Sequence, residues 1–405
     1  MNAVGIDVSK GKSMVAVLRP FGEVVTLPYS VSHTASELSE LANSLKSLDG
    51  EVRVIMEYTG RYYEPVAKAL HEAGIFVSVV NPLLINQYGN NSVRKVKTDK
   101  ADAVKIAKYG LDNWAELREY DPMDTTRQNL LLVCRQYNLY MKNKTAFKSN
   151  LIALLDQTFP TVHKLFKSPV RDDGSQKWVD FATTFWHCEC VCGVSEKAFT
   201  ERYRKWCKRH RYIFSPRKAS EIYAAASEQV PTLPKDNHIK LLVTEAITQL
   251  NAISRTVEAL RSDMQSLAQS LPEYPVVAAL YGAGDTTAAQ LIAEIGDVRR
   301  FKSKQALSAF AGVDPSPNQS GTREAKSTSI TKRGRAPLRK TLFQIMECHL
   351  KRAPHDEPVF QFLDKKRAEG KPYYVYMTAG ANKFLRIYYG RVREYLNALD
   401  SGDES

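Results

Sequence analysis

Cysteine is scarce in this chain, and long apolar runs are missing. Only six cysteines occur among 405 residues, and four of them lie between positions 188 and 207. This usage excludes a dispersed disulfide framework. No stretch approaches the roughly 18 consecutive apolar residues that a membrane helix needs, and the N-terminus carries charged residues where a signal peptide is apolar. We therefore expect a cytoplasmic protein that does not contact membranes.

Acidic residues are outnumbered by basic ones. The 57 Lys and Arg exceed the 44 Asp and Glu, which leaves a formal net charge of +13. Such a balance favours a polyanionic partner, and nucleic acid is the first candidate. Hydrophobic residues make up 43% and charged residues 25% of the chain, which is ordinary globular usage and excludes wholesale disorder. At about 150 residues per domain, the length allows two or three domains.

The N-terminal part alternates short β-branched runs with helical segments. Three such runs within residues 3–30, separated by turn residues, predict a meander of antiparallel strands. Helix, strand, helix, strand and helix follow, and the last helix opens at Thr98. The order β-β-β-α-β-α-β-α predicts an α/β domain with the ribonuclease H topology, in which a parallel strand extends the first strand.

Two heptad seams follow, which predict long helices. The first runs from Leu130 to Leu154, with Lys144 filling one slot, and the second fills ten slots from Ile239 to Leu271. Ten slots in register exceed the usual surface helix of roughly 8 to 20 residues. The pattern therefore favours coiled-coil pairing over two amphipathic helices on a globular core.

Residues 160–235 form an insert rich in proline, aromatic and basic residues, for which we expect irregular structure. From Phe199 to Lys218 there are eight Lys or Arg and one Glu. The aromatic residues among them indicate phosphate contact with base stacking, although a charge run is usually only a solvated face. The interleaved aromatics are Tyr203, Trp206, Tyr212 and Phe214. The basic candidates for nucleic-acid binding are Arg204, Lys205, Lys208 and Arg209.

The same insert gathers sulfur and imidazole ligands. They are His187, Cys188, Cys190, Cys192, Cys207 and His210. A zinc site is conceivable, but Cys-x-Cys-x-Cys is not the usual two-residue knuckle. Reduced, partly buried thiols are the favoured alternative.

Four carboxylates are placed where they could meet. Asp7 lies mid-strand, where a charge is costly without partners, and Glu57 ends the strand expected beside it. Asp99 and Asp102 are three apart at a helix start, on one face. Such oxygen donors select Mg²⁺ or Mn²⁺, and paired metals about 4 Å apart drive phosphoryl transfer. The alternatives are that Asp99 caps its helix, Asp102 pairs with Lys105 and Asp7 bonds hairpin amides.

A basic, serine-rich segment spans residues 311–340, with seven Lys or Arg and one Glu after Ser320. Ser320 follows a Pro/Asn/Gln stretch that cannot be helical, so its hydroxyl is a candidate nucleophile displayed on a loop. A plain Ser/Gly turn is the alternative. The competing serines are Ser316, Ser327 and Ser329. The residues available for phosphate are Arg323, Lys326, Lys332, Arg333 and Arg339.

Before this segment, Gly282-Ala283-Gly284 predicts a turn between two helices. Free amides at such a turn can meet a phosphate, as in a helix-hairpin-helix, but they often only allow two helices to pack.

Taken in order, these residues resemble the DEDD transposases of the insertion-sequence 110 type, also described as bridge-RNA-guided recombinases. The similar motifs are GIDVSK from Gly5, Glu57-Tyr58-Thr59-Gly60, Lys97-Thr98-Asp99 with Asp102-Ala103, Ser320-Gly321, Ile330-Thr331-Lys332-Arg333-Gly334 and Leu338-Arg339. They cover roughly residues 1–155 and 236–395, whereas the insert has no matching motif.

The resemblance implies a Holliday-resolvase-like (RuvC-like) domain in which Asp7, Glu57, Asp99 and Asp102 bind magnesium. It also implies that Ser320 attacks DNA to give a covalent phosphoserine, in a composite centre shared between subunits of a dimer or tetramer. A non-coding guide RNA would pair with donor and target DNA, in a prokaryotic cytoplasm and at the nucleoid when active. The rival interpretations are a hydrolytic junction-resolving nuclease that uses only the carboxylates, and a non-catalytic nucleic-acid-binding scaffold.

We therefore expect an α/β plus α protein with six parts. They are a catalytic domain (1–125), a coiled-coil helix (126–159), the basic insert (160–235), a second coiled-coil helix (236–271), a helical C-terminal domain with the serine segment and a helix-hairpin-helix-like stretch (272–398), and a short tail (399–405).

Overall fold

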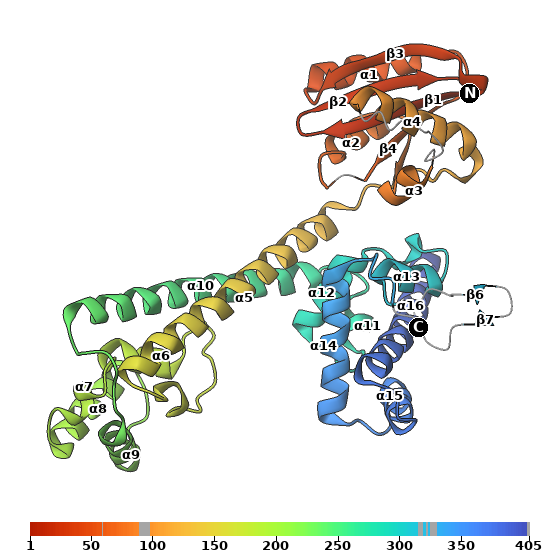
Figure 1. The fold of residues 1–405 in the computed structure, drawn as a ribbon. Coiled ribbons are helices and arrows are strands. Elements are labelled where there is room, and N and C mark those ends of the chain that lie inside the picture. Colours follow the sequence, from red (N-terminus) through yellow and green to blue (C-terminus); the bar gives the residue numbers. More distant parts are fainter. Residues whose placement is uncertain (59, 89–97, 315–318, 321–322, 325–329, 403–405) are drawn as a thin grey trace. The chain divides into compact units, whose positions relative to one another are not determined.

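The computed structural model describes the chain except for residues 59, 89–97, 315–318, 321–322, 325–329 and 403–405. The described residues form two compact units, Met1–Met123 and Asp124–Ser405 (Figure 1). Within these described ranges, no helix is both long and apolar enough to cross a membrane.

The first unit is built on a five-stranded sheet with the order β3-β2-β1-β4-β5. Its strands are β1 (Asn2–Ser9), β2 (Lys12–Leu18), β3 (Val24–Ser32), β4 (Val52–Glu57) and β5 (Phe76–Val80). β1, β2 and β3 pair antiparallel, whereas β4 runs parallel to both β1 and β5. The predicted meander and its parallel extension are therefore confirmed.

Helices cover both faces of this sheet. α1 (Ala35–Lys46) and α2 (Glu64–Glu72) pack on the face that carries Val4 and Ile6. α4 (Asp99–Asp112), with the short α3 (Pro82–Gln87), covers the face that carries Ala3 and Ile55 (Figure 1). Successive strand residues point to opposite faces, so burial of both faces explains why β1 and β4 are almost continuously apolar.

Two glycines let α4 lie directly on the sheet. A Cβ added at Gly5 would overlap the carbonyl oxygen of Ala103 and the amide nitrogen of Ala107, and one added at Gly110 would overlap the Ile55 side chain. The later residue Gly110 of α4 thus lies near the start of β1, and the earlier residue Ala103 lies near Gly5. The helix and the strand therefore run in opposite directions. The first turn of α4 consequently lies beyond Gly5, toward the carboxyl ends of β1 and β4.

In the second unit, the two heptad seams are single helices, α5 (Thr125–Thr158) and α10 (Asn237–Gln269), which pack along each other. The seam is buried, as Val243, Leu250 and Val257 show at seven-residue spacing. Lys144, which interrupts the first seam, lies 3.6 Å from a carboxylate oxygen of Glu258 on α10. The seams thus pair within one chain.

The insert is helical rather than irregular, and this prediction was wrong. It forms α6 (Lys177–Thr184), α7 (Glu189–Cys192), α8 (Glu196–Arg209) and α9 (Pro216–Glu228) on one end of the α5–α10 pair. Tyr203 and Trp206 are only 1% and 4% exposed. Together with Phe199 they form one face of α8, at helical spacing, so they belong to the core and are no surface for stacking bases.

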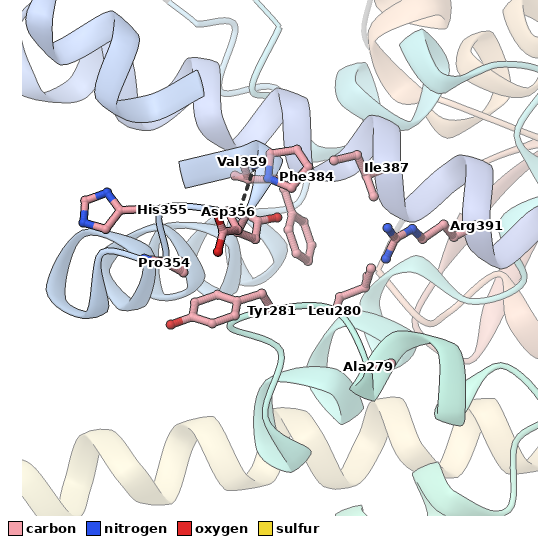
Figure 2. Close-up of a pocket in the computed structure, with 12 residues that line it drawn as sticks. Ala279, Leu280, Tyr281, Pro354, His355, Asp356, Val359, Phe384, Ile387 and Arg391 are labelled. Atoms are coloured by element: carbon pink, nitrogen blue, oxygen red, sulfur yellow. Dashed lines mark hydrogen bonds between the residues drawn. The ribbon is translucent and has the colours of Figure 1, made fainter. Parts of the chain in front are cut away.

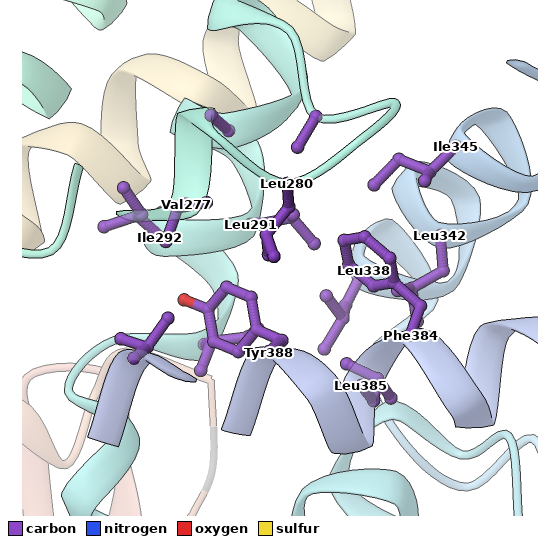
Figure 3. Close-up of a cluster of buried hydrophobic side chains, with 14 of the residues drawn as sticks. Val277, Leu280, Leu291, Ile292, Leu338, Leu342, Ile345, Phe384, Leu385 and Tyr388 are labelled. Atoms are coloured by element: carbon purple, nitrogen blue, oxygen red, sulfur yellow. The ribbon is translucent and has the colours of Figure 1, made fainter. Parts of the chain in front are cut away.

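The other end of the α5–α10 pair carries the C-terminal core. It consists of α11 (Tyr274–Ala278), α12 (Asp285–Ile295), α13 (Lys304–Ala311), α14 (Ala336–Arg352), α15 (Pro358–Ala368) and α16 (Tyr373–Ser401). Figure 3 shows Leu291, Leu338 and Phe384 meeting at its centre. The turn between α11 and α12 is confirmed. A Cβ at Gly282 (φ +82°) would lie 3.0 Å from Ile345 Cγ2, so this glycine serves close packing.

Candidate active site

Asp7 and Glu57 occupy neighbouring positions on adjacent parallel strands. The last paired residues of β1 and β4 are Ile6 and Met56, and Asp7 and Glu57 follow them directly. Strand alternation places Asp7 on the same face as Gly5, the face that α4 covers. The site is thus built at the carboxyl ends of two central strands, beneath the first turn of a helix.

The carboxylates interact electrostatically. The pKa of Glu57 is raised from its ordinary value, first by burial and then by the negative charges of Asp7 and Asp102, while the charge of Lys105 lowers it. The charges of Asp7 and Asp102 therefore both act on the carboxyl group of Glu57, which places the three side chains in one neighbourhood. Lys105, considered from the sequence only as a partner of Asp102, is therefore a basic neighbour of Glu57.

Asp99 stands apart from this group. It is the exposed first residue of α4 and is not among the charges that act on Glu57. It does not cap the helix either, because the Thr98 side chain accepts the hydrogen bond from the Ala101 amide. The structure thus brings together three of the four predicted carboxylates, and the fourth lies one helical turn before Asp102.

The donor set fits a divalent cation by its chemistry. Carboxylate oxygens are the ligands that Mg²⁺ and Mn²⁺ prefer, and burial, followed by repulsion from Asp7 and Asp102, raises the pKa of Glu57. Among the residues that the structure describes, no three His, Cys, Asp or Glu side chains are already gathered at metal-binding distance. Asp7, Glu57 and Asp102 are thus candidate ligands that do not form a preassembled cluster.

The serine segment carries a short two-stranded ribbon. β6 (Gln319–Ser320) pairs antiparallel with β7 (Arg323–Glu324), and Ser320 is the partner of Arg323. The backbone of Ser320 is thus in a strand. The predicted residues Ser316, Lys326, Ser327 and Ser329 lie outside the described residues, as do Thr59, Lys97 and Gly321 of the motifs. Lys332 and Arg333 are exposed.

Both ends of this segment leave the C-terminal core at one point, which we call the neck. A Cβ at Gly312 (φ +66°) would lie 2.6 Å from the amide nitrogen of Gly334. The Asp314 carbonyl accepts a 3.1 Å hydrogen bond from the Thr331 amide. Arg339 Nη1 donates to the carbonyls of Ala311 and Gly334 at 3.1 and 3.0 Å. Arg339, predicted to contact phosphate, therefore holds the neck with this nitrogen.

We expect Arg339→Gln to loosen the neck. Hydrogen bonds from a charged donor contribute about 1.5–3 kcal/mol each, so trypsin should cut between residues 313 and 333 several times faster than in the wild-type protein. The matched control is Lys340→Gln, which removes an exposed neighbouring tryptic site. Equal digestion rates for the two variants would show that Arg339 does not hold the neck.

The basic candidates in the insert lie on the solvent face of α8. Arg204, Lys205, Lys208 and Arg209 are all exposed, opposite the buried aromatic face. Arg204 also lies 3.5 Å from Glu201. This face remains a candidate for phosphate contact. Of the four aromatics predicted to stack on bases, Tyr203 and Trp206 are buried, whereas Tyr212 and Phe214 are half-buried.

The cysteine-rich part of the insert is packed into its core. Cys188 and Cys207 are buried. His187 Nε2 lies 3.0 Å from the Leu233 carbonyl, and its Nδ1 accepts a hydrogen bond from the Glu189 amide. The His210 ring stacks on Trp206. Among the described residues, these side chains do not gather as a group of three or more possible metal ligands.

Two family models match the chain. One, described as a transposase with a DEDD motif of the IS110 type, matches residues 4–160. The other, described as a transposase of the IS116/IS110/IS902 family, matches residues 275–360. The insert lies between these two ranges.

Curated relatives are similar along most of the chain. The insertion element IS110 43.6 kDa protein of Streptomyces coelicolor is 21% identical over 99% of this chain and 97% of its own length. A pilin gene-inverting protein of Moraxella bovis is 24% identical over 85% of this chain and 80% of its own length. The transposase of element IS1111A from Coxiella burnetii matches a shorter part: it is 32% identical over 29% of this chain and 31% of its own length.

Among solved structures, RuvC of Thermus thermophilus is similar over 29% of this chain and 96% of its own length. The identity is 16% and the TM-score 0.23. The same protein in complex with a Holliday junction substrate gives 14% identity and the same TM-score.

Proposed function

This chain belongs to the IS110-type DEDD transposases, which are DNA-processing enzymes, and from this premise we propose a more specific function. It is an RNA-guided, magnesium-dependent recombinase that mobilises its own insertion sequence. It cuts and rejoins donor and target DNA through a covalent bond to Ser320. The gene-inverting activity named for the Moraxella bovis relative is a related rearrangement of DNA.

The observation that carries this proposal is the group of coupled carboxylates. Asp7 and Glu57 follow the last paired residues of β1 and β4, and Asp102 comes from the first turn of α4. The charges of Asp7 and Asp102 both act on Glu57. These three residues would hold the magnesium ion, with Asp99 as the fourth carboxylate. When bound, the ion supplies activation of the attacking group and stabilisation of the leaving oxygen.

The chain's own residues supply the covalent step. Ser320 Oγ attacks a backbone phosphorus and loses its proton, a new Oγ–P bond forms, and the bond from that phosphorus to the strand oxygen breaks. The released sugar oxygen takes up a proton. The phosphodiester energy is conserved in the phosphoserine, so a second strand's hydroxyl can reverse the step. Lys332 and Arg333, with Arg323 and Lys326, would bind the phosphate.

The second copy and the RNA belong to the same proposal. Leu139 on α5 and Leu241 and Leu242 on α10 are about half exposed or more, and apolar side chains outside an intrachain seam suit pairing with another chain. A dimer or tetramer would place the carboxylates of one subunit beside Ser320 of another. The net charge of +13 suits both DNA and a guide RNA.

Ser320→Ala is expected to abolish the protein–DNA adduct and to lower strand exchange at least about 10⁴-fold, because removing a nucleophile leaves only binding and electrostatic stabilisation. The protein should be purified from cells that carry its native flanking DNA, and its bound RNA sequenced. End-labelled DNA is then followed into a denaturant-resistant adduct. Ser316→Ala, Ser327→Ala and Ser329→Ala are the matched controls.

Other outcomes of this experiment identify the rivals. Wild-type exchange by Ser320→Ala would move the nucleophile to whichever control variant fails. Free 5′-phosphates without an adduct in the wild-type protein would indicate a hydrolytic junction-resolving nuclease with water as nucleophile. The absence of an enriched RNA would remove the guide from the proposal.

A further inference from the structure

A pocket of about 320 Å³ in the insert is lined mainly by lysines, and we call it the lysine pocket. It is formed by the chain between α5 and α6, the first residue of α6 and the first turns of α9. Its lining residues are Lys164, Leu165, Phe166, Lys167, Ser168, Lys177 and Lys218. Of these residues only Lys218, which ends the basic run from Phe199, belongs to a pattern noted in the sequence.

The positive charge of the pocket is mostly uncompensated. Lys218 Nζ lies 3.1 Å from a carboxylate oxygen of Glu221. Within the part of the chain that the structure describes, no acidic side chain forms an ion pair with Lys164, Lys167 or Lys177. Lys164, Lys167 and Lys177 therefore line one pocket without a carboxylate partner, and an anion bound there gains attraction from each.

Aromatic rings hold two of these cations in place. The Lys177 ammonium lies 5.3 Å from the centre of the Phe166 ring and 4.8 Å from that of Tyr212, and Lys218 lies 5.7 Å from Phe166. Cation–π contacts of this kind restrict long side chains. The Arg171 guanidinium lies 4.1 Å from the centre of the Tyr212 ring as well.

The electrostatics of Lys177 agree with an anion site. Its pKa is lowered, first by burial; Cys207 opposes this shift, and the charges of Lys218 and Arg171 lower the pKa further. The cations therefore repel one another, and a phosphate between them would relieve that repulsion. Arg171 Nη2 also donates to the carbonyl of His210, at the end of α8.

A second pocket, in the C-terminal core, lacks this excess of positive charge. It has about 400 Å³ and is lined by Tyr281, Asp356, Glu357 and Arg391 among others (Figure 2). Two carboxylates beside one guanidinium give no net attraction for a polyanion. The excess of lysines over carboxylates thus distinguishes the lysine pocket from this one.

We propose that the lysine pocket binds a backbone phosphate of a nucleic acid and anchors that strand to the insert. The ligand class, a phosphodiester, rests on the proposed function, since such an enzyme handles both DNA and RNA. Each bound phosphate releases counterions, so the pocket should contribute to the salt dependence of binding. The insert then acts as a binding module, attached to the catalytic parts through α5 and α10.

The test compares two full-length double variants that remove the same charge from exposed positions. Lys164→Gln/Lys167→Gln alters the pocket, and Lys235→Gln/Lys240→Gln alters the insert's edge. Binding of fluorescein-labelled dT20, rU20 and a native element-end duplex is measured at several salt concentrations. We expect the pocket variant to bind about tenfold more weakly and its salt slope to fall by about one to two, while the control changes less than about twofold.

The outcomes separate this inference from the proposed function. A loss confined to RNA assigns the pocket to a guide strand, and a loss confined to DNA assigns it to donor or target DNA. Equal binding by the two double variants, with Lys177→Gln also unchanged, overturns the inference. The adduct assay with Ser320 is read independently, so weakened binding without any wild-type adduct would retain the pocket and reject the recombinase.

Discussion

Glu57→Gln is expected to lower the rate of DNA strand cleavage at least about a thousand-fold at saturating magnesium. Glu57 is the carboxylate on which both Asp7 and Asp102 act, so it lies at the centre of the proposed metal site. Metal ions supply several kcal/mol of transition-state stabilisation, and about 4 kcal/mol corresponds to three orders of magnitude in rate. Cleavage of labelled DNA measures the rate, and calorimetric titration with Mn²⁺ measures metal binding.

The matched control for this change is Glu40→Gln, which removes an exposed carboxylate from α1 on the opposite face of the sheet. It should leave cleavage within about twofold of the wild-type rate. If Glu57→Gln cleaves within tenfold of wild type and binds Mn²⁺ equally, the acidic pocket is structural. That result would support the rival interpretation of the protein as a non-catalytic nucleic-acid-binding scaffold.

A pH titration gives an independent readout of the same group. Because the pKa of Glu57 is raised above 4.5, metal binding should be complete well above that pKa and be lost as the pH falls through it. Asp102→Asn removes one of the charges that raise the pKa of Glu57. The acid limb of metal binding should therefore move to lower pH in that variant, and an unmoved limb would contradict the coupling.

Glu273→Gln is expected to reduce the free energy of unfolding of the second unit by about 3–5 kcal/mol. Glu273 is 1% exposed and accepts hydrogen bonds from Arg127 Nε and Nη2 at 3.0 and 2.6 Å, which joins α5 to the start of α11. Breaking a buried pair is costly, and Arg127 would keep only its 2.7 Å contact with the more exposed Asp124. Urea unfolding followed by circular dichroism measures the loss.

Two further variants give this prediction its controls. Glu347→Gln removes one partner of the exposed Lys351–Glu347 pair of the same unit and should cost less than about 1 kcal/mol. Replacing both buried partners, as Arg127→Met/Glu273→Leu, should recover much of the stability lost in Glu273→Gln. A loss no larger for Glu273→Gln than for Glu347→Gln would contradict the prediction.

The sheet could be predicted from the sequence because its signals are local. β-branched runs and turn residues define each strand, and the chirality of connections restricts their order. The contact of α4 with β1 could not be predicted from the sequence. Nothing in the residues that flank Gly5 and Gly110 in the chain reveals which helix will pack there. That contact sets where Asp102 lies, and it is also why Asp99, three residues earlier, falls outside the electrostatic group.

The insert shows the opposite failure. Phe199, Tyr203, Trp206 and Cys207 recur at helical spacing, so their burial was readable from the sequence, but the basic residues between them suggested an exposed binding surface. The lysine pocket was not readable in the same way. Its charges come from segments up to 54 positions apart, Lys164 to Lys218, and only tertiary packing brings them together.

Because of the neck, the serine segment can change in evolution independently of the C-terminal core that carries it. Gly312 and Gly334 bring the two chain ends into contact, so the C-terminal core closes without reference to how many residues lie between them. Closing a longer loop costs only about 0.6 kcal/mol for each doubling of its length. Insertions and deletions there can accumulate in evolution, and the segment can be replaced as a cassette, while the helices that carry it keep their packing.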